Sequence, residues 1–413
     1  MSRADYRQFL PQPGQSRIAG ETAREHAENR MKTERTQILF SEWDALGKEP
    51  FHGITTDGSI AEGLFPLNNE GVPSQTIAET ATNVLSRLDD AQRRKMQFPV
   101  ESDVWRKWQN TELYVENHGL RLDEVSKEIR EGVVAVLRAS LSTRGFEKSL
   151  AVMRLNAFLG QVIGSPEVLG EWSYIFCIFG QPSSLEPWGW QLFGHHLSLN
   201  CLVIGDQMVL TPCFLGAEIV YADSGPFTGT SLFEDEERLG LELLRSLETK
   251  ERTRAIVSQS MMGDELPPGR WHFADHLHLG GAYQDNRVVP LEGLPCDKLT
   301  KIQQRNLTDL IEAYIAPLPD GPRSARLEQV ERHLQDTHFC WIGGQDENNA
   351  FYYRIQSPVI FIEFDHHSGL FLTNEKPANF HVHTIVRTPN GNDYGVDLLR
   401  QHYAHAHHHH DHS

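Results

Sequence analysis

The chain has 413 residues, and its 38 basic and 56 acidic side chains give a net charge of −18. This acidic balance argues against a nucleic-acid backbone or an anionic membrane surface as the main partner. Apolar residues make up 39% of the chain, which predicts a globular protein with a sizeable core.

The cysteines and the apolar segments bear on the compartment. Five cysteines are dispersed along the chain without a CxxC pair, which is not the pattern of a disulfide framework or a thiolate zinc site. The sequence has neither an apolar leader nor a run of about 18 apolar residues. We therefore expect a cytoplasmic protein without a membrane segment.

The first half of the chain is predicted to pass from helices to strands. Residues 1–50 are polar and charged, and we expect a solvated N-terminal arm. From 172 to 214 short apolar runs predict strands, with a hairpin turn at 205–207, and 212–229 is expected to be a loop. Apolar residues that recur every three or four positions predict a helical layer over 76–88, 122–140 and 146–163.

The second half repeats this order. The order predicts an α+β fold in which mixed or antiparallel strands carry the site and helices form a layer. We expect one main domain over 51–403, which could consist of two halves, and a flexible histidine-rich tail over 404–413. Helices are predicted over 234–249, 297–315 and 323–334, and strands over 339–342, 351–355, 359–365 and 381–387.

The segment from Pro187 to Asn200 stands out because it holds two tryptophans, two glycines and the adjacent His195 and His196. We predict that the histidines lie within a strand. His195 would then lie on an apolar face, and His196 on a polar face with Ser198. Such a strand could form one wall of a site. The alternative is a buried, hydrogen-bonded histidine pair without chemistry.

Two more clusters of ligand-type side chains lie on predicted strands. Glu363 and Asp365 would share one strand face, as would His381 and His383. Two imidazoles on a strand with a nearby carboxylate suit zinc, iron or manganese. We therefore predict one divalent metal held by His196, Glu363, His381 and His383. The alternative is that histidines merely accumulate in a histidine-rich protein.

Other polar residues near these clusters are candidates for catalysis or for further ligands. Asp365 or His366 could act as a general base or orient a ligand imidazole, and His195 is a third catalytic candidate. His276 and His278 form a second HxH pair in a glycine-rich segment, which makes them a weaker ligand set. The histidines of the tail would bind divalent metals in solution but are not expected to form the site.

Substrate contacts are predicted from arginines and tryptophans. Arg287 and Arg387 could hold an anionic group through their guanidinium donors. The alternative is that each pairs with a local acid. Trp188 and Trp190 could line a pocket for a flat or apolar ligand, or could belong to the core.

Several common catalytic motifs are missing from the sequence. It contains no GxSxG, P-loop, GxGxxG or HExxH pattern, which argues against common serine hydrolases, P-loop enzymes, standard dinucleotide folds and zincins.

Longer motifs carry a resemblance to a known family. The chain resembles the family catalogued as domain of unknown function 3500, over about residues 50–403. The family name supplies no activity, but the resemblance implies that the His-His, Glu-x-Asp-His and His-x-His motifs belong to one pattern. His276, His278 and the tail fall outside it. The matching segments are 51–58, 179–183, 187–200, 285–287, 353–355, 362–366, 381–391 and 393–395.

These observations predict a metal-dependent enzyme that acts on a small molecule, which could be anionic. Hydrolytic or lyase chemistry with a metal-activated water is the first expectation. The first alternative is a non-haem iron oxidoreductase that uses dioxygen, since imidazole suits both zinc and iron. The second alternative is a non-catalytic metal- or ligand-binding protein. The pattern does not predict an oligomeric state.

Overall fold

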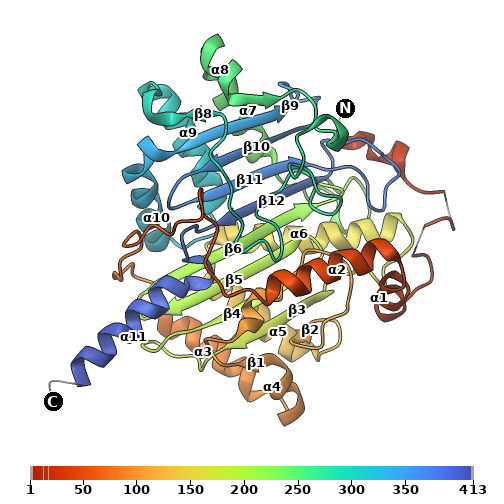
Figure 1. The fold of residues 1–413 in the computed structure, drawn as a ribbon. Coiled ribbons are helices and arrows are strands. Elements are labelled where there is room, and N and C mark those ends of the chain that lie inside the picture. Colours follow the sequence, from red (N-terminus) through yellow and green to blue (C-terminus); the bar gives the residue numbers. More distant parts are fainter. Residues whose placement is uncertain (1–2, 13, 17, 411–413) are drawn as a thin grey trace.

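The protein is built on one mixed sheet of twelve strands, with helices packed against it (Figure 1). The structure, a computed structural model, describes residues 3–410 except 13 and 17. The main strand order is β1-β3-β4-β5-β6-β12-β11-β10-β9-β7. The predicted α+β class is therefore confirmed.

Two antiparallel meanders form the centre of the sheet. The first contains β3 (Tyr174–Phe179), β4 (Trp188–Gly194), β5 (Leu197–Ile204) and β6 (Gln207–Ala217). The second contains β9 (His338–Gly343), β10 (Phe351–Gln356), β11 (Phe361–His366) and β12 (Val382–Arg387). Because β6 pairs antiparallel with β12, the two strand blocks are halves of one continuous sheet.

Short strands complete the edges of the sheet. β1 (Gln97–Phe98) pairs parallel with β3, and β2 (Leu120–Arg121) pairs antiparallel with β3. At the other edge, β7 (Ile256–Ser258) pairs parallel with β9, and β8 (Leu294–Pro295) pairs antiparallel with β9.

The prediction of a loop from residue 212 is wrong, because β6 continues through Pro212 to Ala217. Proline cannot donate to a strand ladder and is tolerated where pairing is interrupted. The register of β5 against β6 shifts at this point, and Asn200 Nδ2 donates to the Pro212 carbonyl at 2.7 Å. The irregularity therefore accommodates the proline.

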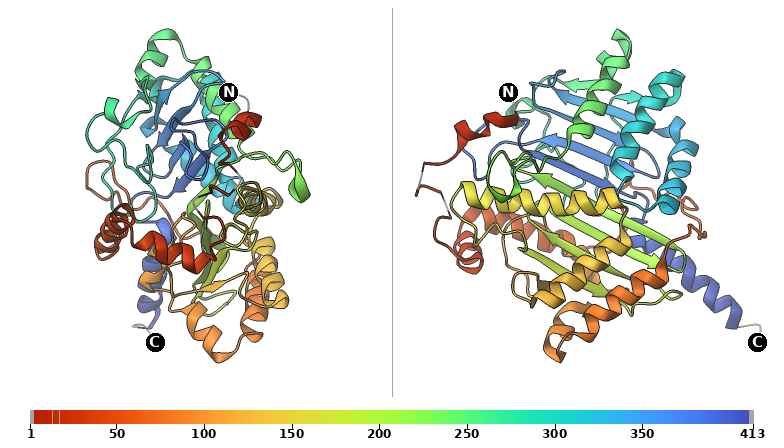
Figure 2. Two further views of the ribbon diagram at one scale, coloured as in Figure 1. Left: turned by 90° about the vertical axis from the view of Figure 1, so that its right-hand side faces the viewer. Right: turned by 180° about the vertical axis from the view of Figure 1, so that it is seen from behind.

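Helices cover one face of the sheet (Figure 2, right). On this face the Tyr353 ring of β10 stacks on Phe364 of β11 at 5.1 Å, and its hydroxyl lies 2.5 Å from that of Tyr314 on α9. The helices of this layer are α3 (Ser74–Ser86), α5 (Lys127–Ser140), α6 (Thr143–Val162), α7 (Glu234–Ser246), α9 (Lys301–Ile315) and α10 (Asp320–Arg332). The shorter α4 (Asp90–Met96) and α8 (Thr249–Ala255) lie toward the two ends of the sheet.

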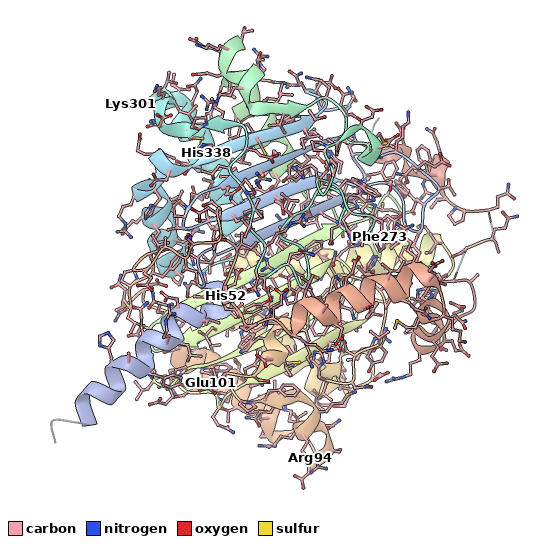
Figure 3. The ribbon with its side chains drawn as sticks, viewed as in Figure 1. His52, Arg94, Glu101, Phe273, Lys301 and His338 are labelled. Carbon is pink, nitrogen blue, oxygen red and sulfur yellow. The ribbon has the colours of Figure 1, made fainter. Side chains whose placement is uncertain are left out.

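The opposite face is covered by the N-terminal region and by the loop between β7 and β8. The N-terminal region contains α1 (Ala23–Met31) and α2 (Glu34–Gly47), and it packs on the body instead of lying free in solvent. Trp43 stacks on Tyr283 of the loop at 4.9 Å. Phe273, labelled in Figure 3, belongs to the same loop and accepts a hydrogen bond from Arg35 on α2.

The C-terminal helix α11 (Val396–His410) includes most of the predicted flexible tail. Its backbone is helical through His410, while residues 411–413 lie outside the described part of the chain. Among the residues that the structure describes, no helix combines the length and the apolar character that crossing a bilayer requires.

A buried carboxylate joins several of these parts. Asp285, fully buried in the covering loop, accepts hydrogen bonds from Arg106 Nε at 2.8 Å and from Arg387 Nη1 at 2.9 Å. The Tyr394 hydroxyl also donates to it at 2.9 Å. Asp285 therefore ties the covering loop to β12 and to two separate segments of the chain.

We predict that Asp285→Ala lowers the free energy of unfolding by about 3–5 kcal/mol, because it leaves two buried guanidinium groups without their shared carboxylate. The control is Lys48→Ala, which removes an exposed ion pair with Asp44 and should cost at most about 0.5 kcal/mol. Urea unfolding measures both changes. Equal transition midpoints for the two variants would contradict the assigned role of Asp285.

Candidate metal centre

Three imidazoles converge where the two meanders join. His381 Nε2 lies 3.3 Å from His196 Nε2 and 3.1 Å from His383 Nε2. All three side chains are buried, with exposures of 2%, 3% and 7% for His381, His196 and His383. One nitrogen from each ring lies within 4.8 Å of the other two. We call these residues the histidine triad.

The sheet itself positions the triad. His383 on β12 pairs in register with Gly216 on β6, so both lie on the face turned away from the helical layer. A Cβ atom at Gly216 would lie 2.8 Å from the Val382 carbonyl oxygen and 3.0 Å from the Cδ2 atoms of both His196 and His383. Glycine at this position therefore leaves room for the two imidazoles to approach each other.

His195 and His196 do not lie within a strand as predicted. They form the two-residue turn between β4 and β5, and His196 has a left-handed φ of 64°. This turn brings the His196 ring toward β12. In a continuous strand, alternation alone would have determined on which face of the sheet the ring lies. The turn is held by hydrogen bonds from His196 N to the Asn110 carbonyl and from Gly216 N to the His196 carbonyl.

The proton position on His381 is determined by its partner. His381 Nδ1 lies 2.8 Å from the carbonyl oxygen of Ser368. Because a carbonyl only accepts, Nδ1 carries the proton and Nε2 has a free lone pair. That lone pair faces the other two histidines. Imidazoles that bind metals are commonly oriented by such a second hydrogen bond.

Burial favours the neutral form of the triad. Desolvation, followed by repulsion from neighbouring imidazoles, holds the pKa of His196 and His383 well below its ordinary value. Burial also lowers the pKa of His381 well below its ordinary value. A histidine binds a metal ion through its neutral imidazole. These rings therefore need not lose protons near neutral pH to bind a cation.

A second group of ligand-type side chains lies beside the triad. One ligand atom from each of His276, Asp365 and His367 lies within 4.8 Å of the others. The His367 ring centroid is 3.9 Å from that of His383, and Asp365 pairs in register with His383. His278 is also close, with ring centroids 6.1 Å apart from His383. The HxH spacing was the only sequence signal for His276 and His278.

Asp365 lies at the centre of this second group. Its Oδ2 accepts from Leu277 N at 3.3 Å, and its buried Oδ1 has no hydrogen-bond partner in the described structure. Burial, with a contribution from the charge of Glu363, raises the pKa of Asp365 well above its ordinary value. The predicted catalytic carboxyl therefore lies beside the triad and is poised to hold a proton.

Glu363, predicted as a metal ligand, has other partners. Its carboxylate accepts hydrogen bonds from Leu279 N at 2.9 Å, Gly280 N at 2.8 Å and the Tyr352 hydroxyl at 2.7 Å. These contacts engage both oxygens and anchor the covering loop to the sheet. Glu363 therefore serves as a loop anchor, and the nitrogens that converge come from the other three predicted ligands.

The remaining predicted catalytic histidines, His366 and His195, have hydrogen-bond partners outside the triad. His366 lies on the helical face of β11, where its Nδ1 accepts from Phe351 N and its Nε2 lies 3.2 Å from a Glu237 oxygen. His366 therefore lies on the opposite face of the sheet from Asp365, away from the position that its predicted role as a base or ligand-orienting residue requires. His195 Nδ1 lies 2.7 Å from Asn156 Oδ1, and its ring lies beside that of His196, with centroids 3.8 Å apart.

Comparison with known proteins identifies the family. A family model described as "Protein of unknown function (DUF3500)" matches residues 70–396. The chain belongs to this family. Neither the curated proteins nor the solved structures gave a match. The match agrees with the resemblance stated from the motifs, and in this member of the DUF3500 family it includes the triad and both halves of the sheet.

The predicted substrate contacts of this DUF3500 protein have structural partners. Arg387 is fully buried and pairs with Asp285 at 2.9 Å and with Asp393 at 3.2 Å. Trp188 and Trp190 are fully buried core residues, and Trp190 Nε1 donates to Ser140 Oγ at the end of α5. These three side chains are therefore committed to the fold.

Arg287 differs from these residues because it is partly exposed. Its guanidinium donates to the carbonyl oxygens of Leu279 at 3.4 Å and Gly269 at 3.1 Å. In these two contacts the guanidinium is held by carbonyl oxygens and not by a carboxylate. The prediction that Arg287 holds an anionic group thus remains a prediction.

A further carboxylate orders the loop beside His381. Glu218 Oε1 accepts hydrogen bonds from the backbone N–H groups of Leu370, Phe371 and Leu372 at 2.7–2.8 Å. Burial raises the pKa of Glu218 to about 7. Because Ser368, which holds His381, is two residues away from this contact, Glu218 contributes to positioning the triad.

We predict that Glu218→Gln changes how stability depends on pH. The raised pKa means that folded Glu218 binds a proton between pH 4.5 and 7 while the unfolded chain does not. Its contribution is therefore complete below pH 4.5 and is lost as pH rises through 7, by about 3 kcal/mol. The glutamine variant should lack this loss and gain stability relative to the parent at pH 8.

Urea unfolding between pH 5 and pH 8 measures this difference. The control is Glu186→Gln, which removes the same charge from an exposed position. Parallel curves for the parent and Glu218→Gln would show that Glu218 does not titrate in this range.

Proposed function

We propose that this protein is a metal-dependent enzyme in which His196, His381 and His383 hold one divalent cation. The observation that supports this proposal is the convergence of three buried, neutral imidazole nitrogens, with the free lone pair of His381 facing the other two. Three buried imidazoles without a cation would share few hydrogen bonds among them. A bound cation would satisfy all three.

The distances within the triad suit a single ion. Ligand nitrogens about 2.0–2.1 Å from one tetrahedral ion lie about 3.3–3.4 Å apart. His381 Nε2 is 3.3 Å and 3.1 Å from its two neighbours. Structural zinc sites usually have four protein ligands, whereas three leave a position for water or substrate. The triad therefore favours catalysis over a purely structural role.

Hydrolytic or lyase chemistry on a small molecule is the proposed reaction class. A divalent cation bound by the triad would lower the pKa of a water molecule and polarise a substrate carbonyl. Asp365, in register with His383, lies where it could accept and return a proton. Of the two arginines predicted to contact substrate, Arg287 is the partly exposed one, and it could hold an anionic substrate group.

A reducing compartment also belongs to the proposal. All five cysteines are buried and unpaired, as is usual where thiols are kept reduced. This supports the expected cytoplasmic location.

We predict that the double variant His381→Ala, His383→Ala loses about one metal ion per chain, because two of three ligands are removed. The background should carry glutamine at His405, His407, His408, His409, His410 and His412, so that the tail does not bind metal. Protein purified without metal-affinity chromatography is analysed by plasma mass spectrometry.

The matched control is the double variant His333→Ala, His402→Ala, which removes two partly exposed histidines outside the triad. It should keep the metal content of its parent. If the triad variant also keeps its full metal content while circular dichroism shows a native fold, the triad is not the binding site.

We also predict that Gly216→Ala weakens metal binding about 10–100-fold without changing a ligand, as alterations behind metal ligands commonly do. The added methyl group would press on the Val382 carbonyl oxygen of β12 and on the Cδ2 atoms of His196 and His383, and would thus displace two ligands. Zinc affinity is measured by competition with a chelating dye. Gly240→Ala is the control, because its methyl group would press on Tyr353, away from the triad. Equal affinity in both variants would contradict the close packing.

Dioxygen chemistry on iron is the second candidate. The observation that favours it is the carboxylate of Asp365 beside the imidazoles, since two histidines and one carboxylate form the facial site of many iron oxygenases. Iron in the purified protein, together with oxygen consumption when small organic acids are added, would favour this reaction. Zinc or manganese without oxygen consumption would favour hydrolysis.

A further inference from the structure

The second group of ligand-type side chains has unsatisfied atoms that point to a ligand. In the described structure the buried Asp365 Oδ1 and His367 Nε2 have no hydrogen-bond partner. Asp365 is fully buried, and His367 is 3% exposed. A buried polar atom without a partner costs about 1–3 kcal/mol. Two such atoms side by side need a compensating interaction.

The geometry of this pair resembles two ligands of one ion more than a hydrogen bond. His367 Nε2 lies 3.1 Å from Asp365 Oδ2, yet its alignment does not make a hydrogen bond. Ligand atoms about 2.0–2.2 Å from a common ion fall near this separation. A carboxylate and an imidazole that face each other in this way are therefore suited to share a cation.

His276 is the third ligand-type side chain of this group and comes from the covering loop. Its ring stacks on that of His367, with centroids 4.0 Å apart and planes 6° apart, and also on Trp271. His276 is only half-buried and has a left-handed φ of 49°. It therefore lies at the solvent side of the group, where an ion could enter.

We propose that His276, Asp365 and His367 hold a second divalent cation, next to the one assigned to the triad. This inference rests on the proposed function, because it extends the same site to a centre with two ions. The two ligand groups are adjacent: His367 and His383 rings are 3.9 Å apart, and Asp365 is directly across from His383 in the sheet.

The ligand chemistry indicates which cations suit this position. Two imidazoles and a carboxylate accept zinc, manganese or iron. Asp365 would bind as a carboxylate, since metal ligands must be deprotonated, and in a centre with two ions it would be a ligand in place of the proton-transfer role given above. Paired ions in hydrolytic enzymes lie about 3.5–4 Å apart and stabilise both the attacking and the leaving oxygen. A second ion would therefore favour hydrolysis over lyase chemistry.

The covering loop would then be part of the centre. His276 comes from the loop, while Asp365 belongs to β11 and His367 follows it directly. The loop is already anchored next to this point by the contacts of Glu363 with Leu279 and Gly280. Because the His276 and His367 rings are stacked in parallel planes, the His276 imidazole must turn about its side-chain bonds for its nitrogen to face the same ion as His367.

The experiment titrates metal-free, full-length protein, with its six tail histidines changed to glutamine, with Mn²⁺ alone. Bound ions are counted by calorimetry, and electron paramagnetic resonance reports whether two ions are close enough to couple. We expect about two ions per chain with a coupled spectrum. His276→Gln, at a half-buried position, should retain one ion and lose the coupling. Asp365→Asn, which keeps the shape of the side chain, should do the same.

His338→Gln is the matched control, because His338 lies at the start of β9, far from the triad in the sheet (Figure 3). It should bind two coupled ions. Suppose that the parent binds one ion, that His276→Gln keeps it and that His381→Ala, His383→Ala loses it. This result would overturn the second position and leave the proposed function standing. One ion lost in His276→Gln but kept in the triad variant would overturn the triad instead. No bound ion in the parent would overturn both.

Discussion

The structure depends on the cost of burying titratable groups on one face of a sheet. Imidazoles and carboxylates lose hydration there, and each needs a partner to offset that loss. Where the partner is a backbone group or an arginine, as for Glu363 and Asp285, the contact is complete. At Asp365 and His367 the protein groups leave the buried Oδ1 and Nε2 atoms without a hydrogen-bond partner. The candidate site is distinguished by the position of these two atoms, which lie beside converging imidazoles.

Buried carboxylates hold the elements that cover this face. Asp285 and Glu363 fix the loop between β7 and β8, and Glu218 fixes the segment that precedes His381. These contacts restrict two loops at points next to the histidines. Preorganised ligands need little rearrangement to bind an ion, which is the physical advantage of anchoring loops in this way. The fold and the site are therefore supported by the same interactions.

Periodicity predicted much of the fold, because strands and helices leave local patterns. The helix predicted over 76–88 is α3 (Ser74–Ser86), and the last four strands appear close to their predicted positions. The turn at His195 and His196 was missed because apolar residues alternate across it into β5. The continuation of β6 beyond Pro212 was missed because proline usually marks an end, and its accommodation depends on a register shift with β5.

The site could be predicted only in part, because its members meet through long-range pairing. His381 and His383 were predicted from strand alternation, which is a local rule. Their contact with His196 requires β6 to pair with β12, and no local pattern shows which strands of two separate meanders will adjoin. His276 lies in a loop whose sequence has no strand or helix periodicity. Its position depends on how the loop lies across β11. The histidine centre is thus a product of the junction between the two halves, and neither meander alone contains it.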